Sequence, residues 1–234
     1  MPERLIAKQV LGTRIFREHL ARYNFALPMT MGKSVLDVAC GSGYGTAHLA
    51  ANGATHVTGI DASSDAVAYA SSNYPSEQVR FVCADAHDLS AIGQVDVVVS
   101  FETIEHLADP VKFLREISRV MHDDAVFIVS TPVRKKGSLD QKPKNPFHLR
   151  EWSIAEFAGL LRQHFSSVDL RFQYDVVDSW YPLSRSLRRL GMKIRSPHRA
   201  AEFEQFPVVE QPPDAGGINI EPQYIVALCR GPIK

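Results

Sequence analysis

Residues 35–45 read Val-Leu-Asp-Val-Ala-Cys-Gly-Ser-Gly-Tyr-Gly, an apolar run followed by a turn with three glycines. Glycines let the backbone turn tightly, and they let a ligand approach where a β-carbon would stand in the way. The free amides at the start of a following helix favour a bound anion. This strand, turn and helix predict a ligand-binding loop in an α/β protein.

The flanking sequence repeats the alternation of strand and helix. Continuous runs rich in β-branched residues predict strands buried on both faces at 34–39, 56–60, 79–83, 95–100 and 125–130. Helices are expected between them at 45–52, 63–73 and 110–121, the last with Asp109 as its cap and Pro110 at its first position. Such a pattern predicts a doubly wound, mostly parallel sheet.

After residue 132 the regularity ends. We expect a long functional loop at about 133–150, a helix at 153–164 with a Ser153–Glu156 capping box, and strands at 167–172 and 223–229. We divide the chain into a helical lid or cap, 1–30, and a ligand-binding domain, 31–234, with insertions at about 133–150 and 178–220. The basic stretch 183–199 predicts a solvated amphipathic helix, or else a contact with phosphate or an anionic membrane surface.

Composition limits the class of protein. The 234 residues carry 26 basic and 26 acidic side chains, and this balance argues against a protein that coats nucleic acid. No apolar run approaches the length of a membrane span, and the start resembles no secretion signal, so we expect a cytoplasmic protein. Cys40, Cys83 and Cys229 fit no disulfide framework, and we expect all three to be small buried side chains.

The spacing of the glycines restricts the class of ligand that the loop can bind. A dinucleotide loop needs its third glycine at position 46, which is Thr46, and no Gly-Lys-Ser/Thr follows to form a phosphate loop. This spacing argues against a nicotinamide oxidoreductase. Asp37, four residues before Gly41, could hold the loop amides or face a ligand ammonium, and it would repel a pyrophosphate. The predicted ligand therefore carries an amino-acid group.

Two further acids follow the next strands. Asp61 lies 16 residues beyond Gly45, where a carboxylate can accept both hydroxyls of a ribose. Asp85 can accept a hydrogen bond from an exocyclic adenine amine, while the backbone of Ala86 contacts the ring edge. Both acids could instead be helix caps. An amino acid, a ribose and an adenine together describe S-adenosylmethionine.

These motifs, from about residue 17 to 174, resemble those of class I S-adenosylmethionine-dependent methyltransferases. The resemblance implies a Rossmann-like sheet of seven strands with an antiparallel last strand, and S-adenosylhomocysteine as the product. It implies the following donor-binding residues: Tyr23, Asp37, Ala39, Gly41, Gly43, Gly45, Asp61, Ala62, Asp85, Ala86, Ser100 and Phe101.

Candidate catalytic residues follow the fourth and fifth strands. His106 could act as a base, and Glu102 would share its face if the turn is helical. The alternative for His106 is a structural bond to a loop carbonyl. His148 could orient a polar acceptor or merely stiffen its loop. Since no two histidines have metal-ligand spacing with a third ligand nearby, we expect metal-independent transfer.

The acceptor is less constrained. No Asn/Asp-Pro-Pro-aromatic motif follows the fourth strand, so no nucleic-acid partner is expected. Residues 18–23, 101–106 and 145–148 resemble bacterial methyltransferases of surface polysaccharides and sugars. This favours a hydroxyl of a sugar or another small polar metabolite. Alternatives are N- or C-methylation of a small metabolite and a non-catalytic donor-binding subunit. A homo-oligomer and a peripheral membrane contact are compatible with the sequence.

Overall fold

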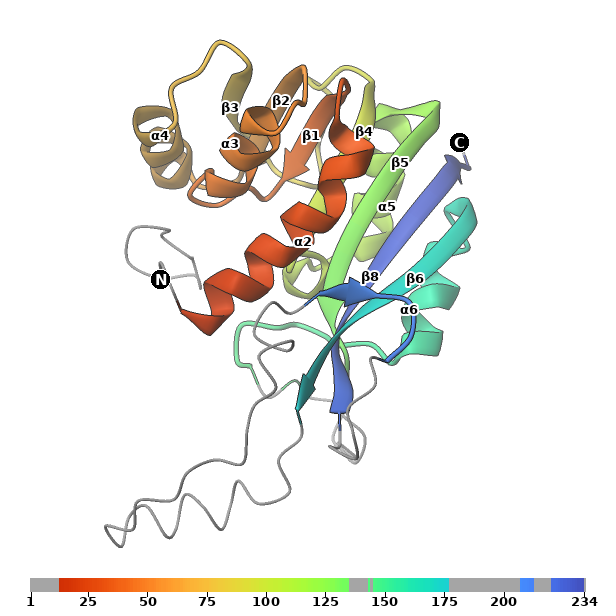
Figure 1. Cartoon of the computed structure of the whole chain (residues 1–234). Coiled ribbons are helices and arrows are strands. Elements are labelled where there is room, and N and C mark those ends of the chain that lie inside the picture. The colour runs from red at the N-terminus through yellow and green to blue at the C-terminus, as the bar shows by residue number, and fades with distance from the viewer. Residues whose placement is uncertain (1–12, 135–142, 144, 177–206, 213–219, 234) are drawn as a thin grey trace, which may run out of the picture.

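The computed structural model describes residues 13–134, 143, 145–176, 207–212 and 220–233. Eight strands form one sheet, in the order β3-β2-β1-β4-β5-β8-β6-β7 (Figure 1). The first five pair in parallel, and β8 runs antiparallel between β5 and β6. The strands are β1 (Ser34–Val38), β2 (His56–Asp61), β3 (Val79–Cys83), β4 (Val95–Phe101), β5 (Met121–Pro132), β6 (Phe165–Val176), β7 (Val208–Val209) and β8 (Ile220–Pro232).

This arrangement confirms the predicted Rossmann-like sheet with its antiparallel last strand. The described residues add β7, a two-residue strand on the outer edge of β6 that the sequence did not predict. The strand order reverses between β1 and β4, and parallel sheets bind ligands beyond the carboxyl ends of the strands at such a point.

The described helices begin close to their predicted positions. They are α2 (Arg14–Thr30), α3 (Tyr44–Ala51), α4 (Ser64–Asn73), η1 (Ile104–His106), α5 (Pro110–Val120) and α6 (Ile154–Leu161). Asp109 caps α5 by accepting the Lys112 amide at 2.9 Å. Ser153 and Glu156 form the predicted capping box of α6. Local sequence therefore sets both starts.

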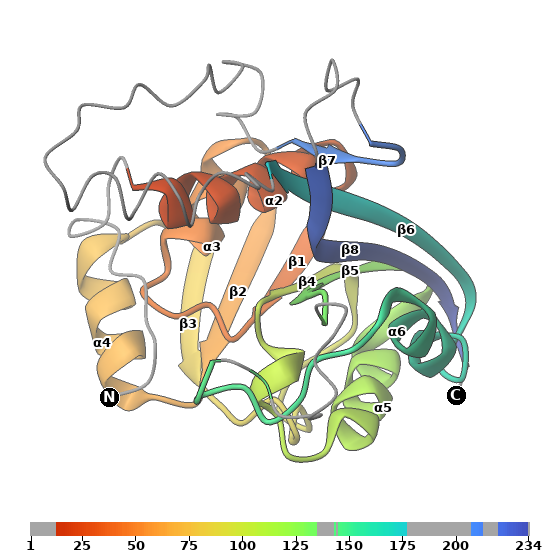
Figure 2. The ribbon, with the colours of Figure 1, turned by 90° about the horizontal axis from the view of Figure 1, so that it is seen from below.

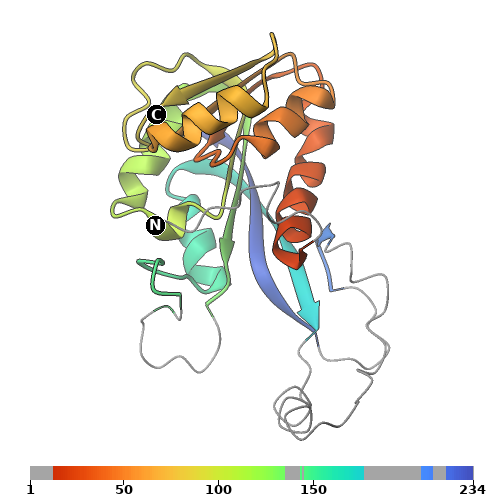
Figure 3. The same ribbon diagram turned by 90° about the vertical axis from the view of Figure 1, so that its left-hand side faces the viewer.

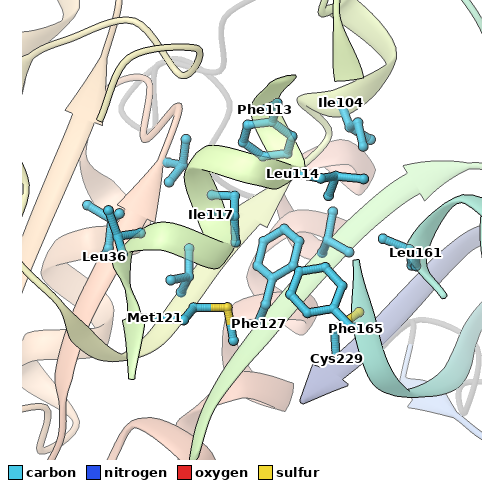
Figure 4. Close-up of a cluster of buried hydrophobic side chains, with 14 of the residues drawn as sticks. Leu36, Ile104, Phe113, Leu114, Ile117, Met121, Phe127, Leu161, Phe165 and Cys229 are labelled. Atoms are coloured by element: carbon cyan, nitrogen blue, oxygen red, sulfur yellow. The ribbon is translucent and has the colours of Figure 1, made fainter. Parts of the chain in front are cut away.

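Helices α2 and α3 lie on one face of the sheet and helices α5 and α6 on the other (Figure 2). A hydrophobic core fills the space between the sheet and the helices on each face. Since side chains alternate along a strand, Val35 of β1 joins the core under α2 and α3, while Leu36 joins the core under α5 and α6. Phe113, Phe127 and Phe165 fill the centre of the second core (Figure 4). These cores fix the strand ends that carry the site.

Three strands are longer than predicted and one helix is shorter. β5 begins at Met121, where we expected the preceding helix to end, and β6 and β8 extend beyond 167–172 and 223–229. Their antiparallel pairing continues through partly exposed residues, which a search for buried apolar runs does not detect. The helix predicted at 153–164 ends at Leu161.

The N-terminal helix α2 packs against α3 and β4. Figure 3 shows α2 running alongside α3. Ile15, His19 and Tyr23 on this helix line the cavity described below. The helix is therefore part of the wall of the site, and its role as a lid stays a prediction. The basic stretch 183–199 lies outside the described residues.

Two smaller points concern burial and membranes. Cys40 and Cys229 are buried as expected, but the prediction was wrong for Cys83, which is exposed at the end of β3. β3 is the edge strand of the sheet, and the Cys83 thiol lies 3.7 Å from the Ala62 carbonyl. Among the described residues no helix combines the length and the apolar character that a bilayer span requires.

Candidate active site

A cavity of about 840 Å³ opens at the carboxyl ends of β1, β2 and β4. Of the predicted donor-binding residues, eight line it: Tyr23, Ala39, Gly41, Asp61, Ala62, Asp85, Ala86 and Phe101. The candidate catalytic residues Glu102, His106 and His148 line it as well. One cavity thus joins residues predicted to hold the donor to residues predicted to act on the acceptor.

The glycine loop is built by backbone conformations that most residues avoid. Gly41 and Gly43 have φ values of 56° and 82°, and Ala39 also adopts a positive φ of 61°. A β-carbon at Gly41 would meet no atom within 4 Å, so the backbone there lies open to the cavity. The loop therefore allows the close approach of a ligand that the sequence predicted.

Asp61 fixes this loop in place. Its Oδ2 accepts the Gly41 amide at 3.0 Å, and its Oδ1 accepts the Ser63 amide at 2.9 Å. Asp61 is therefore tied to the loop and to the start of α4, and it still faces the cavity. The N-cap of α4 is Ser63, whose hydroxyl accepts the Ala66 amide at 3.3 Å, so the alternative role of Asp61 as a helix cap is not observed. Ribose binding by Asp61 is compatible with this geometry and stays a prediction.

Asp37 lies beneath the loop instead of facing the cavity. It is buried, it accepts the Thr46 hydroxyl at 2.7 Å, and the Tyr23 hydroxyl lies 3.3 Å from each of its oxygens. Burial raises the pKa of Asp37 to about 7. The expectation that Asp37 holds the loop amides was wrong for the Gly41 amide, because Asp61 takes it.

Gly43, Gly45 and Ser100 also lie behind the cavity wall. A β-carbon at Gly43 would come within 2.8 Å of Ala70 and the Phe81 ring, and one at Gly45 would collide with the Tyr23 ring. The buried Ser100 hydroxyl donates to the Val38 carbonyl at 3.2 Å. The structure gives these three residues packing roles that shape the loop, and direct donor contact by them stays a prediction.

At the far side of the loop, the exposed Asp85 forms a turn with His87. Its Oδ1 lies 2.8 Å from both the amide and the Nδ1 of His87, and the amide hydrogen bond lowers the pKa of Asp85. No helix starts here, so the alternative role as a helix cap is not observed. The carboxylate and the neighbouring Ala86 face the cavity.

These residues fit S-adenosylmethionine by their chemistry and placement. The open glycine backbone suits the amino-acid part, Asp61 offers acceptor oxygens for a ribose, and Asp85 with Ala86 offers an acceptor and an apolar surface for an adenine. Phe101 packs edge-on against Tyr23, with ring centroids 4.9 Å apart, and closes the cavity between β4 and α2.

Beyond β4, the chain turns sharply at Glu102. Its φ of 54° is unusual for a residue with a side chain, and such strain collects at functional sites. The Ser130 hydroxyl donates to Glu102 Oε1 at 2.7 Å, and burial raises the pKa of this carboxyl group. The helix η1 starts only at Ile104, so the prediction that Glu102 and His106 share a helical face was wrong.

The loop before α6 is attached to η1 through its backbone. The Glu105 carbonyl accepts the Leu149 amide at 2.8 Å, and His106 Nδ1 lies 2.9 Å from the Phe147 carbonyl. His106 therefore does form the structural bond to a loop carbonyl that we considered, and it lines the cavity as well. These bonds bring His148 next to His106, with ring centroids 4.9 Å apart.

Both nitrogens of His148 have partners. Nδ1 lies 2.9 Å from Glu151 Oε1, and Nε2 lies 3.0 Å from the Asn145 amide nitrogen. Since an amide nitrogen only donates, Nε2 accepts and the proton is on Nδ1. For His106 the carbonyl partner likewise places the proton on Nδ1.

Glu105 was not among the predicted site residues, although it belongs to the quoted motif. It is fully buried, and burial with the nearby Glu102 raises its pKa well above the usual range. Its Oε2 accepts the Thr131 hydroxyl at 3.2 Å. Ligand atoms of Glu105, His106 and His148 lie within 4.8 Å of one another. Spacing along the chain could not reveal this group, because His148 is brought in by the loop.

Other residues of the wall also lacked a clear sequence signal. Tyr224 and Gln223 of β8 line the cavity. Arg22 is not among the lining residues; it lies fully buried with its guanidinium 4.5 Å from the Tyr224 ring centroid. A buried arginine on an amphipathic helix looks like a surface residue in the sequence.

Comparisons with known proteins show which family the chain is similar to. Residues 36–129 match the family model described as "Methyltransferase domain". A Mycobacterium tuberculosis (strain CDC 1551 / Oshkosh) protein named "Probable S-adenosylmethionine-dependent methyltransferase" is 38% identical over 161 residues, which cover 68% of this chain and 58% of that protein. A ubiquinone biosynthesis O-methyltransferase of Aeromonas salmonicida is 33% identical over 104 residues, or 43% of each chain.

Solved structures share the fold. A 1,6-didemethyltoxoflavin-N1-methyltransferase of Burkholderia thailandensis, with bound S-adenosylhomocysteine, aligns with a TM-score of 0.56 at 17% identity, over 97% of this chain and 81% of that one. The chain matches 58% of the length of the mycobacterial relative. The sheet order, the glycine loop and these matches together show that the chain carries a class I S-adenosylmethionine-dependent methyltransferase domain.

Proposed function

We propose that the protein moves a methyl group from S-adenosylmethionine to a hydroxyl of a sugar or another small polar metabolite. The observation that carries this proposal is the single cavity between the glycine loop and the group Glu105, His106 and His148. The names of similar proteins include O-methyltransferases, among them those of Aeromonas salmonicida and Penicillium expansum, which supports an oxygen acceptor.

S-adenosylmethionine, when bound, supplies an electrophilic methyl group on a sulfonium. The work of this chain is to hold the acceptor oxygen in line at near-attack distance and to exclude water. Phe101 and Tyr23, whose rings are in edge-on contact, supply an aromatic part of the cavity lining. Glu102, which follows Phe101 and has a positive φ of 54°, lines the same cavity.

A neutral hydroxyl is a poor nucleophile, so its proton must leave as the new bond forms. In our proposal one of the three candidate groups His106, His148 and Glu102, which all line the cavity, accepts this proton. Arg134, at the same cavity, would contact a polar acceptor from the side of β5.

The first experiment is calorimetry with S-adenosylhomocysteine, with NADH as the control ligand. We expect micromolar binding to the wild type and a loss of at least tenfold in Asp61→Ala, because that variant lacks the loop anchor and the ribose acceptor. Asp65→Ala, an exposed acid on the same segment, is the matched control and should bind as the wild type does. Binding of NADH, or no binding of S-adenosylhomocysteine by folded protein, would contradict the proposal.

The acceptor is then sought among nucleotide-sugars and small hydroxylated metabolites with deuterated methyl donor. Product fragmentation locates the label. A label on nitrogen or carbon would refute the oxygen acceptor and support the alternative of N- or C-methylation. Donor binding without product from any acceptor class would favour a non-catalytic donor-binding subunit. A cytoplasmic location, a homo-oligomer and a peripheral membrane contact stay predictions.

A further inference from the structure

Glu105, His106 and His148 share features that the proposed transfer reaction does not by itself require. All three line the cavity, and their ligand atoms lie within 4.8 Å of one another. They come from η1 and from the loop that the Glu105 carbonyl holds in place. A carboxylate with two imidazoles, open to solvent on one side, is a common donor set for a divalent transition metal.

The two histidines are oriented as metal ligands usually are. Each has its Nδ1 proton directed to an oxygen: the Phe147 carbonyl for His106 and the Glu151 carboxylate for His148, both at 2.9 Å. Such partners fix the neutral tautomer and leave the Nε2 lone pair for coordination. His106 Nε2 has no hydrogen-bond partner among the described residues, and an ion at His148 Nε2 would replace the Asn145 amide.

Glu105 supplies an independent observation. Its side chain is completely buried, and one of its oxygens, Oε1, has no hydrogen-bond partner within the described part of the chain. A buried carboxylate oxygen without a partner is costly, and it is rare unless water or an ion satisfies it. The strained Glu102 lies close enough to influence Glu105 electrostatically, so a second carboxylate is near the same point.

We propose that Glu105, His106 and His148 bind a divalent cation at the acceptor end of the cavity. Donors about 2.1 Å from one ion lie at most about 4.2 Å apart, so a small movement of side chains closes the group around it. The ion would take the acceptor hydroxyl as a further ligand and lower its pKa. The acceptor proton would then pass to Glu102, which lines the same cavity, and not to the histidines. This role would replace the metal-independent transfer that we expected from the sequence.

This role rests on the proposed function, but binding of the ion can be tested without it. Protein treated with a chelator is titrated with Mn²⁺, followed by electron paramagnetic resonance, and with Zn²⁺, followed by calorimetry. We expect one ion per chain for at least one of the two metals. His106→Ala and His148→Ala should each weaken binding by more than tenfold. Glu151→Gln should weaken it by about 10–100-fold, because the neutral amide is a weaker acceptor for the Nδ1 proton of His148.

His122→Ala, which removes an exposed histidine from β5, is the matched control and should bind as the wild type does. Circular dichroism and S-adenosylhomocysteine calorimetry of each variant show that it is folded. The isosteric variant Glu151→Gln, at a half-buried residue of the cavity wall, keeps the test valid if a histidine variant unfolds. The proposal is overturned if folded wild type binds neither metal, or if the affinities of Glu151→Gln and the folded histidine variants equal that of the control.

The two proposals fail separately. If the wild type binds S-adenosylhomocysteine but no metal, the cation site is refuted and the proposed methyl transfer stands. If it binds the metal but no S-adenosylhomocysteine, the cation site stands and the proposed methyl transfer is refuted.

Discussion

The Tyr23 hydroxyl lies 3.3 Å from both carboxylate oxygens of Asp37. Tyr23 belongs to the N-terminal helix α2, and Asp37 to β1, the strand that leads into the glycine loop. The contact therefore connects the helix that walls the cavity to the base of the donor loop. Both side chains are buried, so water cannot replace this hydrogen bond.

Tyr23→Phe tests that connection. The variant leaves a buried carboxylate with one donor fewer, and we expect the free energy of unfolding at pH 8 to fall by about 1–3 kcal/mol. S-adenosylhomocysteine should also bind more weakly, because the loop loses support from below. Urea unfolding and calorimetry measure the two effects. Tyr69→Phe, a half-buried tyrosine of α4, is the control, and equal losses in both variants would argue against the specific contact.

Asp37 should make stability depend on pH with an unusual sign. Burial raises its pKa in the folded protein to about 7, whereas the unfolded chain ionises near 3.9. Between these values the folded state holds a proton that the unfolded state has released, so stability falls as pH rises from about 4 to 7. Asp37→Asn should make this fall smaller, and unfolding curves at several pH values measure it. The buried Glu102 and Glu105, whose pKa values are also raised, should contribute the remainder. Asp65→Asn should keep it; an unchanged slope in Asp37→Asn would refute the assignment.

Gly45 and Tyr23 compete for the same space. A β-carbon at position 45 would lie 1.9 Å from Tyr23 Cζ, a separation that no packing tolerates. Gly45→Ala should therefore lower the free energy of unfolding by about 1–3 kcal/mol. In the Tyr23→Ala background the same change should cost much less, since the obstructing ring is gone.

Gly159→Ala provides the control for this cycle. A β-carbon at Gly159, inside α6, would meet no atom within 4 Å. The variant should be neutral or up to about 1 kcal/mol more stable, because alanine favours a helix over glycine. Additive losses in the Gly45 and Tyr23 double variant would show that the clash is not the cause.

Arg22 is a buried cation of which only part of the guanidinium is hydrogen-bonded within the described residues. Its Nη1 donates to Gln173 Oε1 at 2.5 Å, while Nε and Nη2 have no hydrogen-bond partner among the described residues. Its positive charge opposes the effect of burial on the pKa of Glu102. Arg22→Ala should destabilise the protein by about 3–5 kcal/mol, because it leaves buried carboxyl groups uncompensated. Thermal unfolding of both variants measures the effect. Arg80→Ala, at an exposed position of β3, is the control and should change stability by less than about 0.5 kcal/mol.

Local sequence patterns were enough to predict the parallel half of the sheet, the glycine loop and the acids at the ends of β2 and β3. These features depend on residues close together in the chain: an apolar strand, a turn that needs glycine, and a polar side chain directly after it. Because parallel strands end at one edge of the sheet, local motifs were enough to place Gly41, Asp61 and Asp85 around one cavity.

The side-chain contacts beneath and beyond that loop depend on the tertiary fold and could not be predicted from local sequence. Asp37 bonds to Tyr23 and Thr46, while Asp61 holds the loop, and the spacing along the chain allowed either arrangement. His148 reaches Glu105 and His106 through backbone hydrogen bonds between segments about 40 residues apart. Such contacts depend on how a loop folds back over the sheet, and no pattern of neighbouring residues encodes that path.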